Sequence, residues 1–304
     1  MTRRVPGSPV YQAEKALKPG FASGQDRHEA KAKGTAKRKI FSRSTMETYL
    51  TDIADLIEWV RAEYGVKDAD QMTSEHARAY LDSLAARNLS GGYLSRKRSA
   101  IAKYCQIKYG TRWDLGGTWH SDARPEWAYT AEQAEELIAN LRAHARDPKI
   151  ANVVKLQATA GLRILESVHL RASDIDPAHC MIRVEEDTKG GKVRVVRVDP
   201  QHQHFLEDMK TQGEHNDKDR QHVFRDRGKP RHGLDKRASR AVAEACDRLQ
   251  IICYGMHGFR KMFAQQRYAE YRAQGMSDLE ARETLMHELG HNDPKEMDSY
   301  LVDS

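Results

Sequence analysis

Two sets of polar residues share His291, and each set could form a reactive site. Residues 287–291 spell H-E-x-x-H, which on a helix would place two histidines on one face for zinc and a glutamate to activate water. The extended form of that motif needs glycine at 294 and histidine at 297, where this chain has Pro294 and Met297. Another form uses a distant glutamate, but Glu296 is the sole glutamate after His291. A zinc metalloprotease is therefore the weaker alternative.

The second set is an ordered series that begins far upstream of His291. It comprises Gly161-Leu162-Arg163 with Glu166 three residues on, Lys189 between two strand-like runs, His257 with Arg260, Leu289-Gly290-His291, and Tyr300 nine residues later. Each piece alone is weak, but the order and the spacings together resemble the tyrosine recombinase family of phage integrases and Xer-like enzymes. The resemblance covers roughly residues 44–304.

The resemblance implies transesterification at a DNA phosphodiester. Tyr300 would be the nucleophile, and its covalent phosphotyrosine would conserve the bond energy for rejoining without ATP. Arg163 and Arg260 would hold the non-bridging oxygens as charge builds up on them. Lys189, at the tip of a hairpin, would protonate the departing 5′-hydroxyl.

The remaining roles also follow from the resemblance. His257 would be the acid–base partner of Tyr300, His291 would hydrogen-bond the phosphate, and Glu166 would orient Arg163 from the same helix face. The family hairpin places the catalytic lysine first, which selects Lys189 over Lys192 as the general acid. No metal and no other cofactor is implied, since cationic side chains take the place of a metal.

These roles predict a site-specific DNA recombinase or integrase that works through a 3′-phosphotyrosyl intermediate and a Holliday junction. Its partner would be double-stranded DNA at attachment or core sites, and its active form a homotetramer on that DNA. An accessory DNA-bending protein is a further expected partner. Integration or excision of a mobile element is the expected purpose, with a topoisomerase-like or resolvase role as the runner-up. A non-catalytic DNA-binding protein on the same fold is the alternative from another class.

The charge of the chain is concentrated near its start. The 304 residues carry a net charge of +6, yet residues 1–43 alone contain eleven basic and three acidic residues. We interpret residues 1–43 as a basic, partly mobile arm with a short helix near residues 11–17. Because phosphate neutralisation releases counterions, the arm indicates a polyanionic partner, with Lys37, Arg38 and Lys39 as candidate DNA contacts.

The rest of the chain is long enough for about two domains. Apolar residues at helical spacing predict a helical, SAM-like core-binding domain over residues 44–112. Its third helix carries the candidate DNA contacts Arg96, Lys97, Arg98 and Lys103. Residues 113–128 are expected to be a linker, and residues 129–304 a mixed α/β catalytic domain whose hairpin pairs strands 181–185 and 193–198. The predicted fold is mainly α with a small β-sheet.

Other features exclude several classes of protein. No stretch approaches the roughly 20 apolar residues of a membrane-spanning helix, and the basic N-terminus lacks the apolar core of a signal peptide. The four cysteines are far apart and form no C-x-x-C pair, which argues against a disulfide scaffold. We therefore expect a cytoplasmic, DNA-associated protein without membrane contact.

The sequence departs from the family pattern in three places. Lys261 stands where a histidine usually follows the second arginine. His291 comes 31 positions after Arg260, a longer interval than is typical, which indicates extended helices with a turn at Gly275. The sequence also stops four residues after Tyr300. We therefore expect subunit contacts to use the basic arm or the longer helix before His291 in place of a C-terminal helix.

Overall fold

The computed structural model describes residues 7–119, 124, 126–185, 193–216, 222–224 and 232–302. They divide into two compact units, Met1–Asp122 and Ala123–Ser304, which are described separately below. Within these ranges, no helix combines the length and the apolar character needed to cross a membrane.

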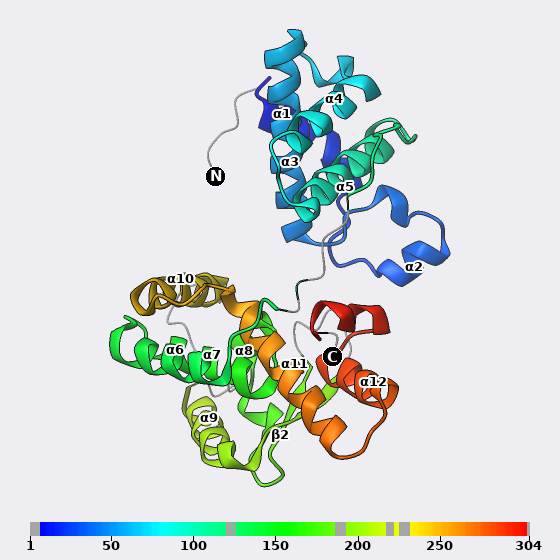
Figure 1. The fold of residues 1–304 in the computed structure, drawn as a ribbon. Coiled ribbons are helices and arrows are strands. Elements are labelled where there is room, and N and C mark those ends of the chain that lie inside the picture. Colours follow the sequence, from blue (N-terminus) through cyan, green and yellow to red (C-terminus); the bar gives the residue numbers. More distant parts are fainter. Residues whose placement is uncertain are drawn as a thin grey trace. The chain divides into compact units, whose positions relative to one another are not determined.

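The first unit is helical (Figure 1). Serine side chains start three of its helices, because the hydroxyls of Ser8, Ser42 and Ser90 accept backbone N–H groups that have no partner within the helix. The apolar stripe of the longest helix forms the core together with its neighbours. The elements are α1 (Pro9–Leu17), η1 (Lys18–Gly20), α2 (Arg27–Ala32), η2 (Ala36–Arg38), α3 (Arg43–Tyr64), η3 (Ala69–Gln71), α4 (Ser74–Ala85) and α5 (Gly91–Lys108).

The segment expected to be a mobile arm is packed into this unit over its described part. The predicted short helix is present as α1, and its Ala13 and Leu17 are fully buried against α3 and α5. Ile40 is also buried, and its backbone pairs with Gly20 and Ala22 through hydrogen bonds of 2.8 and 2.9 Å. Burial of these apolar side chains explains why the segment packs here. They belong to the hydrophobic core of the unit, which the basic composition of residues 1–43 did not predict.

The second unit combines helices with one small antiparallel sheet, as predicted (Figure 1). Thr130 and Gln133 form the capping box that begins its first helix. The elements are α6 (Ala131–His144), α7 (Lys149–Ala160), α8 (Ile164–His169), η4 (Ala172–Asp174), β1 (Ile175–Asp176), β2 (Met181–Val184), β3 (Arg194–Arg197), η5 (Pro200–His202), α9 (Gln203–Asn216), α10 (His232–Leu249), α11 (Gly255–Ala273), α12 (Asp278–Leu289) and η6 (Pro294–Ser299).

The hairpin and the long interval before His291 both take the predicted form. Strands β2 and β3 pair in the antiparallel direction with Ile182 opposite Val196, while the residues between them, Lys189 included, lie outside the described part of the chain. Helices α11 and α12 are separated by a turn in which Gly275 has a φ of +91°. Helix α11 packs against α7 and α12, and so brings together residues that are distant in the sequence.

Candidate active site

The H-E-x-x-H sequence does not form the helical face that a zinc site needs. Helix α12 ends at Leu289, and Gly290 adopts a left-handed conformation with a φ of +69°. His291 therefore lies beyond the helix, and although it lines the same cavity as the exposed His287, its two ring nitrogens contact Arg260, Tyr300 and Glu296. The carboxylate of Glu288 is buried elsewhere, 2.9 Å from the Tyr271 hydroxyl. The metalloprotease alternative is wrong for this geometry.

Tyr300 is buried beside two histidines and an arginine. It follows the short helix η6 and is 3% exposed. Its hydroxyl oxygen lies 3.1 Å from His291 Nε2 and 3.3 Å from Arg260 Nε. The rings of His257 and His291 both meet the Tyr300 ring edge-on, with centroids 5.3 and 5.2 Å away. The four residues come from α11, the turn after α12 and the end of η6.

Arg260 is fully buried and hydrogen-bonded on every side of its guanidinium. It donates to the Gly161 carbonyl, to the Leu289 carbonyl at 2.5 Å and to His291 Nε2 at 3.2 Å. Gly161 can approach this closely because it ends α7 in a left-handed conformation, where a Cβ would lie 2.3 Å from the Phe263 ring. The Gly-Leu-Arg motif therefore includes a backbone contact to the second arginine.

Glu166 links Arg163 to a buried arginine that sequence reasoning missed. Its carboxylate accepts from the Arg163 backbone N–H at 2.7 Å and from the Arg163 guanidinium at 2.8 Å. Arg194 of β3 donates to the same carboxylate through two nitrogens, at 2.6 and 3.0 Å. Burial would raise the pKa of Glu166, but the hydrogen bonds and charge of Arg194 outweigh it, and the pKa is lowered.

Three consecutive backbone carbonyls at the C-terminal end of α12 each accept a hydrogen bond from a different arginine. Arg194 Nε donates to Glu288 O at 2.9 Å, Arg260 donates to Leu289 O, and Arg163 donates to Gly290 O at 3.4 Å. These carbonyls have no partner inside the helix, and they form the negative end of its dipole. Arg163 keeps 22% of its side chain exposed, so its guanidinium can also reach a ligand from solvent.

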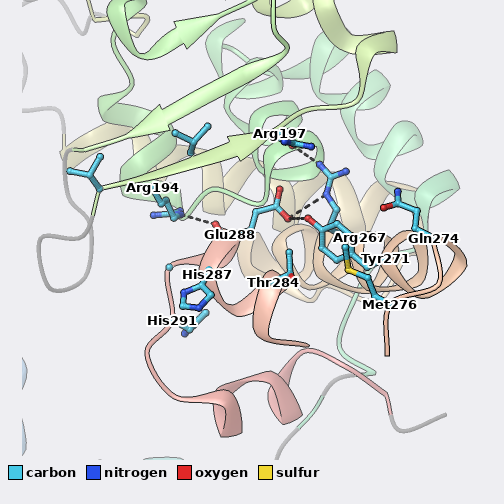
Figure 2. A pocket seen from close by; sticks show the side chains of 13 residues that line it. Arg194, Arg197, Arg267, Tyr271, Gln274, Met276, Thr284, His287, Glu288 and His291 are labelled. Atoms are coloured by element: carbon cyan, nitrogen blue, oxygen red, sulfur yellow. Dashed lines mark hydrogen bonds and ion pairs between the residues drawn. The ribbon is translucent and has the colours of Figure 1, made fainter. Parts of the chain in front are cut away.

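A cavity of about 770 Å³ opens between β3, α11 and α12 (Figure 2). Its lining includes Arg194, Glu288 and His291, together with Tyr271 and Arg267 from α11. Glu288 faces Tyr271 and Arg267 at 2.9 and 3.4 Å, and burial raises the pKa of its carboxyl despite the charge of Arg267.

Burial, and after it the charges of the neighbouring arginines, lowers the pKa values of both histidines. Desolvation and the charge of Arg260 lower the pKa of His257, although the residue retains exposed surface. His291 is more deeply buried, and desolvation, Arg260 and Arg163 lower its pKa to about 4 against the opposing effect of Glu296. Because Arg260 can only donate, His291 Nε2 must accept, and the proton of the ring resides on Nδ1 facing Glu296.

The depressed pKa of His291 gives an expected dependence of stability on pH. Between the ordinary pKa of 6.5 and about 4, the unfolded chain binds a proton that the folded chain does not. The free energy of unfolding of the second unit should therefore fall as the pH decreases through this window, by on the order of 2–3 kcal/mol. Urea unfolding at pH 7.5, 6 and 5 measures the slope, and His291→Asn should make it shallower, while the part due to the similarly lowered pKa of His257 remains. Equal slopes for both proteins would contradict the assignment.

Several residues expected to contact DNA have structural partners in the first unit. Lys97 is 1% exposed and lies 3.0 Å from Asp52 and 2.5 Å from Asp55, so its selection as a DNA contact is corrected. It faces inward because α5 turns this position toward α3 while Arg96 stays 42% exposed. Lys103 donates to the carbonyls of residues 36, 37 and 39, and so fixes the η2 turn.

Lys97→Met should therefore weaken folding and leave DNA affinity unchanged. The substitution leaves the buried carboxylate of Asp52 with Arg96 as its remaining partner, 3.2 Å away, so the loss should approach but not exceed about 3–5 kcal/mol, the cost of a fully broken buried ion pair. The thermal midpoint of the first unit should fall clearly, while Lys67→Met, the same substitution at an exposed lysine of this unit, should change it little. A stable Lys97→Met protein that loses DNA binding would show that the lysine is a contact after all.

Other cations gather at a groove of about 580 Å³ in the first unit. Basic side chains from α2, η2 and the end of α5 line it, and none of its described lining residues is acidic. The basic residues of the lining are Arg27, Lys31, Lys37, Lys39, Lys103 and Arg112. Arg38 lines an adjoining hollow with Lys37 and Arg112. The structure thus brings together Lys37, Arg38, Lys39 and Lys103 and adds Arg27, Lys31 and Arg112 to the predicted set.

A helical unit followed by a mixed α/β unit, with a buried tyrosine set among arginines and histidines, is the architecture of the tyrosine recombinases. The chain belongs to the phage integrase family: the model of that family matches residues 128–302. The model of the phage integrase N-terminal SAM-like domain matches residues 35–110.

Individual proteins are similar over parts or all of the chain. Tyrosine recombinase XerD of Caulobacter vibrioides is 29% identical over 171 residues, which is 53% of this chain and 54% of that protein. This chain therefore matches about half the length of that relative. The XerH recombinase in a pre-cleavage complex with its difH substrate has a TM-score of 0.65 at 14% identity, covering 100% of this chain and 94% of that one. The Tn1549 transposon integrase with transposon right end DNA gives 0.61 at 15%, covering 92% and 96%. Both share the fold.

Proposed function

We propose that this protein is a site-specific DNA recombinase that cleaves and rejoins double-stranded DNA through a 3′-phosphotyrosyl intermediate. The proposal rests mainly on the position of the Tyr300 hydroxyl, which lies between Arg260 and His291. Arg163 contacts the Gly290 carbonyl, which directly follows the end of α12. The family membership supports this choice, and the transposon integrase with the same fold supports a role in moving an element into or out of DNA. The protein would act on nucleoid DNA in the cytoplasm.

The proposed reaction is an exchange of phosphate esters. The Tyr300 oxygen bonds to phosphorus, the bond from phosphorus to the 5′-oxygen breaks, and that oxygen takes a proton from Lys189. Arg163 and Arg260 hold the non-bridging oxygens while charge accumulates there, a contribution of the kind that oxyanion donors make. The second exchange reverses these steps with a 5′-hydroxyl from another strand.

DNA binding in the first unit is proposed to use the basic groove. Its cations come from three elements and meet no acidic residue in the described lining, so a phosphate backbone can neutralise several at once. Such contacts position DNA without reading its sequence. The groove residues Arg27, Lys31 and Gly34 precede residues 35–110, the segment that the SAM-like family model matches.

Assembly and cofactor use are also part of the proposal. Two duplexes with two cleavage sites each require four active tyrosines, which supports a homotetramer that proceeds through a Holliday junction. The arginines, histidines and lysine supply the charge and the protons for the exchange, so the reaction is proposed to need neither metal nor ATP.

Covalent capture from random DNA tests the proposed function and identifies the target sequence in the same experiment. The protein is incubated with a pool of nicked duplexes that carry a randomised segment, and the DNA that remains attached after denaturation is sequenced. We expect one recurrent site joined through its 3′-phosphate to Tyr300, with the same yield in the presence of EDTA. Absence of any attached DNA, or its loss with EDTA, would overturn the proposal.

A further inference from the structure

The last described segment of the chain holds a carboxylate against the histidine that contacts Tyr300. Glu296 lies on η6, and its Oε2 contacts His291 Nδ1. The other ring nitrogen of His291 points at the Tyr300 hydroxyl, 3.1 Å away. Helix η6 is fixed by Met297, which is fully buried and whose carbonyl accepts the Tyr300 backbone N–H. Tyrosine, histidine and glutamate thus form a continuous chain of polar contacts.

We propose that His291 takes the proton of Tyr300 during DNA cleavage and that Glu296 is the positioning residue that makes it able to do so. The inference rests on the proposed function, and it assigns to His291 the step that the sequence resemblance gives to His257. Both histidine rings meet the Tyr300 ring edge-on, but among the described contacts it is Nε2 of His291, and not a nitrogen of His257, that lies within hydrogen-bond reach of the hydroxyl.

Glu296 acts first on the tautomer of His291. A carboxylate at Nδ1 keeps the proton on that nitrogen, so Nε2 is the unprotonated, accepting nitrogen that faces Arg260 and the Tyr300 hydroxyl. The second effect of Glu296 is electrostatic. When His291 takes the Tyr300 proton it becomes a positively charged imidazolium, which the adjacent carboxylate stabilises. The side chain of Glu296 remains 41% exposed, so it reaches His291 from the solvent side.

DNA itself should strengthen this base. Without ligand, His291 faces the cations Arg260 and Arg163 and the neutral His257, with Glu296 as the one carboxylate in contact among the described residues. A bound phosphate brings negative charge to the two arginines and offsets their repulsion of a proton on His291. The histidine is therefore neutral in the free protein and more basic once the scissile phosphate is in place.

Protons and bonds balance in the proposed step. The Tyr300 oxygen forms the bond to phosphorus and its proton passes to His291 Nε2, while the 5′-oxygen leaves with a proton from Lys189. On rejoining, the attacking 5′-hydroxyl returns a proton to Lys189, and His291 gives its proton back to the departing Tyr300. No oxidant, metal or other co-reactant enters.

The test compares Glu296→Gln with wild type in single-turnover cleavage of a nicked duplex that carries the captured site. Enzyme is in excess, rates are scaled to the active fraction, and position 300 holds either tyrosine or a fluorotyrosine. Fluorination lowers the phenol pKa, so the phenol loses its proton more readily and the cleavage rate depends less on the base. We expect Glu296→Gln to be at least about tenfold slower with tyrosine, and most of that deficit to vanish with fluorotyrosine.

The control is Asp298→Asn, an exposed carboxylate on the same η6 that pairs with Arg282 and not with His291. It should cleave at the wild-type rate with both tyrosines. A Glu296→Gln deficit of equal size with tyrosine and fluorotyrosine would assign Glu296 a structural role and overturn the inference, as would an unchanged rate. A wild-type protein that forms no covalent product at all would instead overturn the proposed function.

Discussion

Tyr300→Phe is expected to abolish covalent attachment to DNA, with a loss of at least about a thousandfold. Phenylalanine keeps the ring that packs between His257 and His291 and removes only the oxygen that would bond to phosphorus. The folded structure should lose little, about 1 kcal/mol for the hydrogen bond from Arg260. Denaturing gel electrophoresis of the nicked duplex after incubation measures the covalent product directly.

The matched control is Tyr268→Phe. Its hydroxyl bonds to Asp278 at the surface of α11, so its loss should leave the covalent yield unchanged. Tyr300→Phe should still bind the duplex with wild-type affinity, because the phosphate contacts come from arginines. Covalent product in Tyr300→Phe would identify another nucleophile and exclude the assignment.

Arg260→Lys is the second change with a large expected effect, and it should reduce both cleavage and stability. An ammonium group cannot reach the Gly161 carbonyl, the Leu289 carbonyl and His291 together, and it presents a point charge where a guanidinium offers a planar fork. We expect cleavage to slow by about 10²–10³-fold. Unsatisfied buried carbonyls should cost about 1–3 kcal/mol in unfolding free energy.

Arg272→Lys, an exposed arginine at the end of the same α11, serves as the control and should change neither quantity. Single-turnover cleavage and thermal unfolding are measured on the same preparations. Normal cleavage by Arg260→Lys would mean that Arg260 is a packing residue, and that Arg163 alone neutralises the phosphate.

The sequence motifs predicted the residues that meet at Tyr300 because those residues occur at recognisable spacings. Arg194 and Glu296 could not be assigned from the sequence, for physical reasons. Arg194 occupies an inward position of β3, alternating with the exposed Val193 and Val195, and a run of valines and arginines does not reveal which side faces the core. Glu296 stood out only as a possible metal ligand, and its position opposite His291 depends on the turn at Gly290.

The basic segment and the basic helix show a different limit of prediction. Composition predicts a charged arm, but a few apolar residues, among them Leu17 and Ile40, are enough to dock it. Lys97 stands in a run of cations, and only the rotation of α5 separates it from its exposed neighbour Arg96. Charge patterns thus pointed to the segments that line the proposed DNA-binding groove, but they did not separate the buried Lys97 from the exposed cations.

The three carbonyls at the end of α12 have a consequence for how this chain can vary. Residues 288–290 each accept from a different arginine, so a one-residue shift there would separate all three arginines from their acceptors at once. The turn at 274–277 carries no such contacts to the described arginines of the site, and Gly275 has open space around its Cα. Length changes should therefore accumulate between α11 and α12, while the distance from the end of α12 to Tyr300 stays constant.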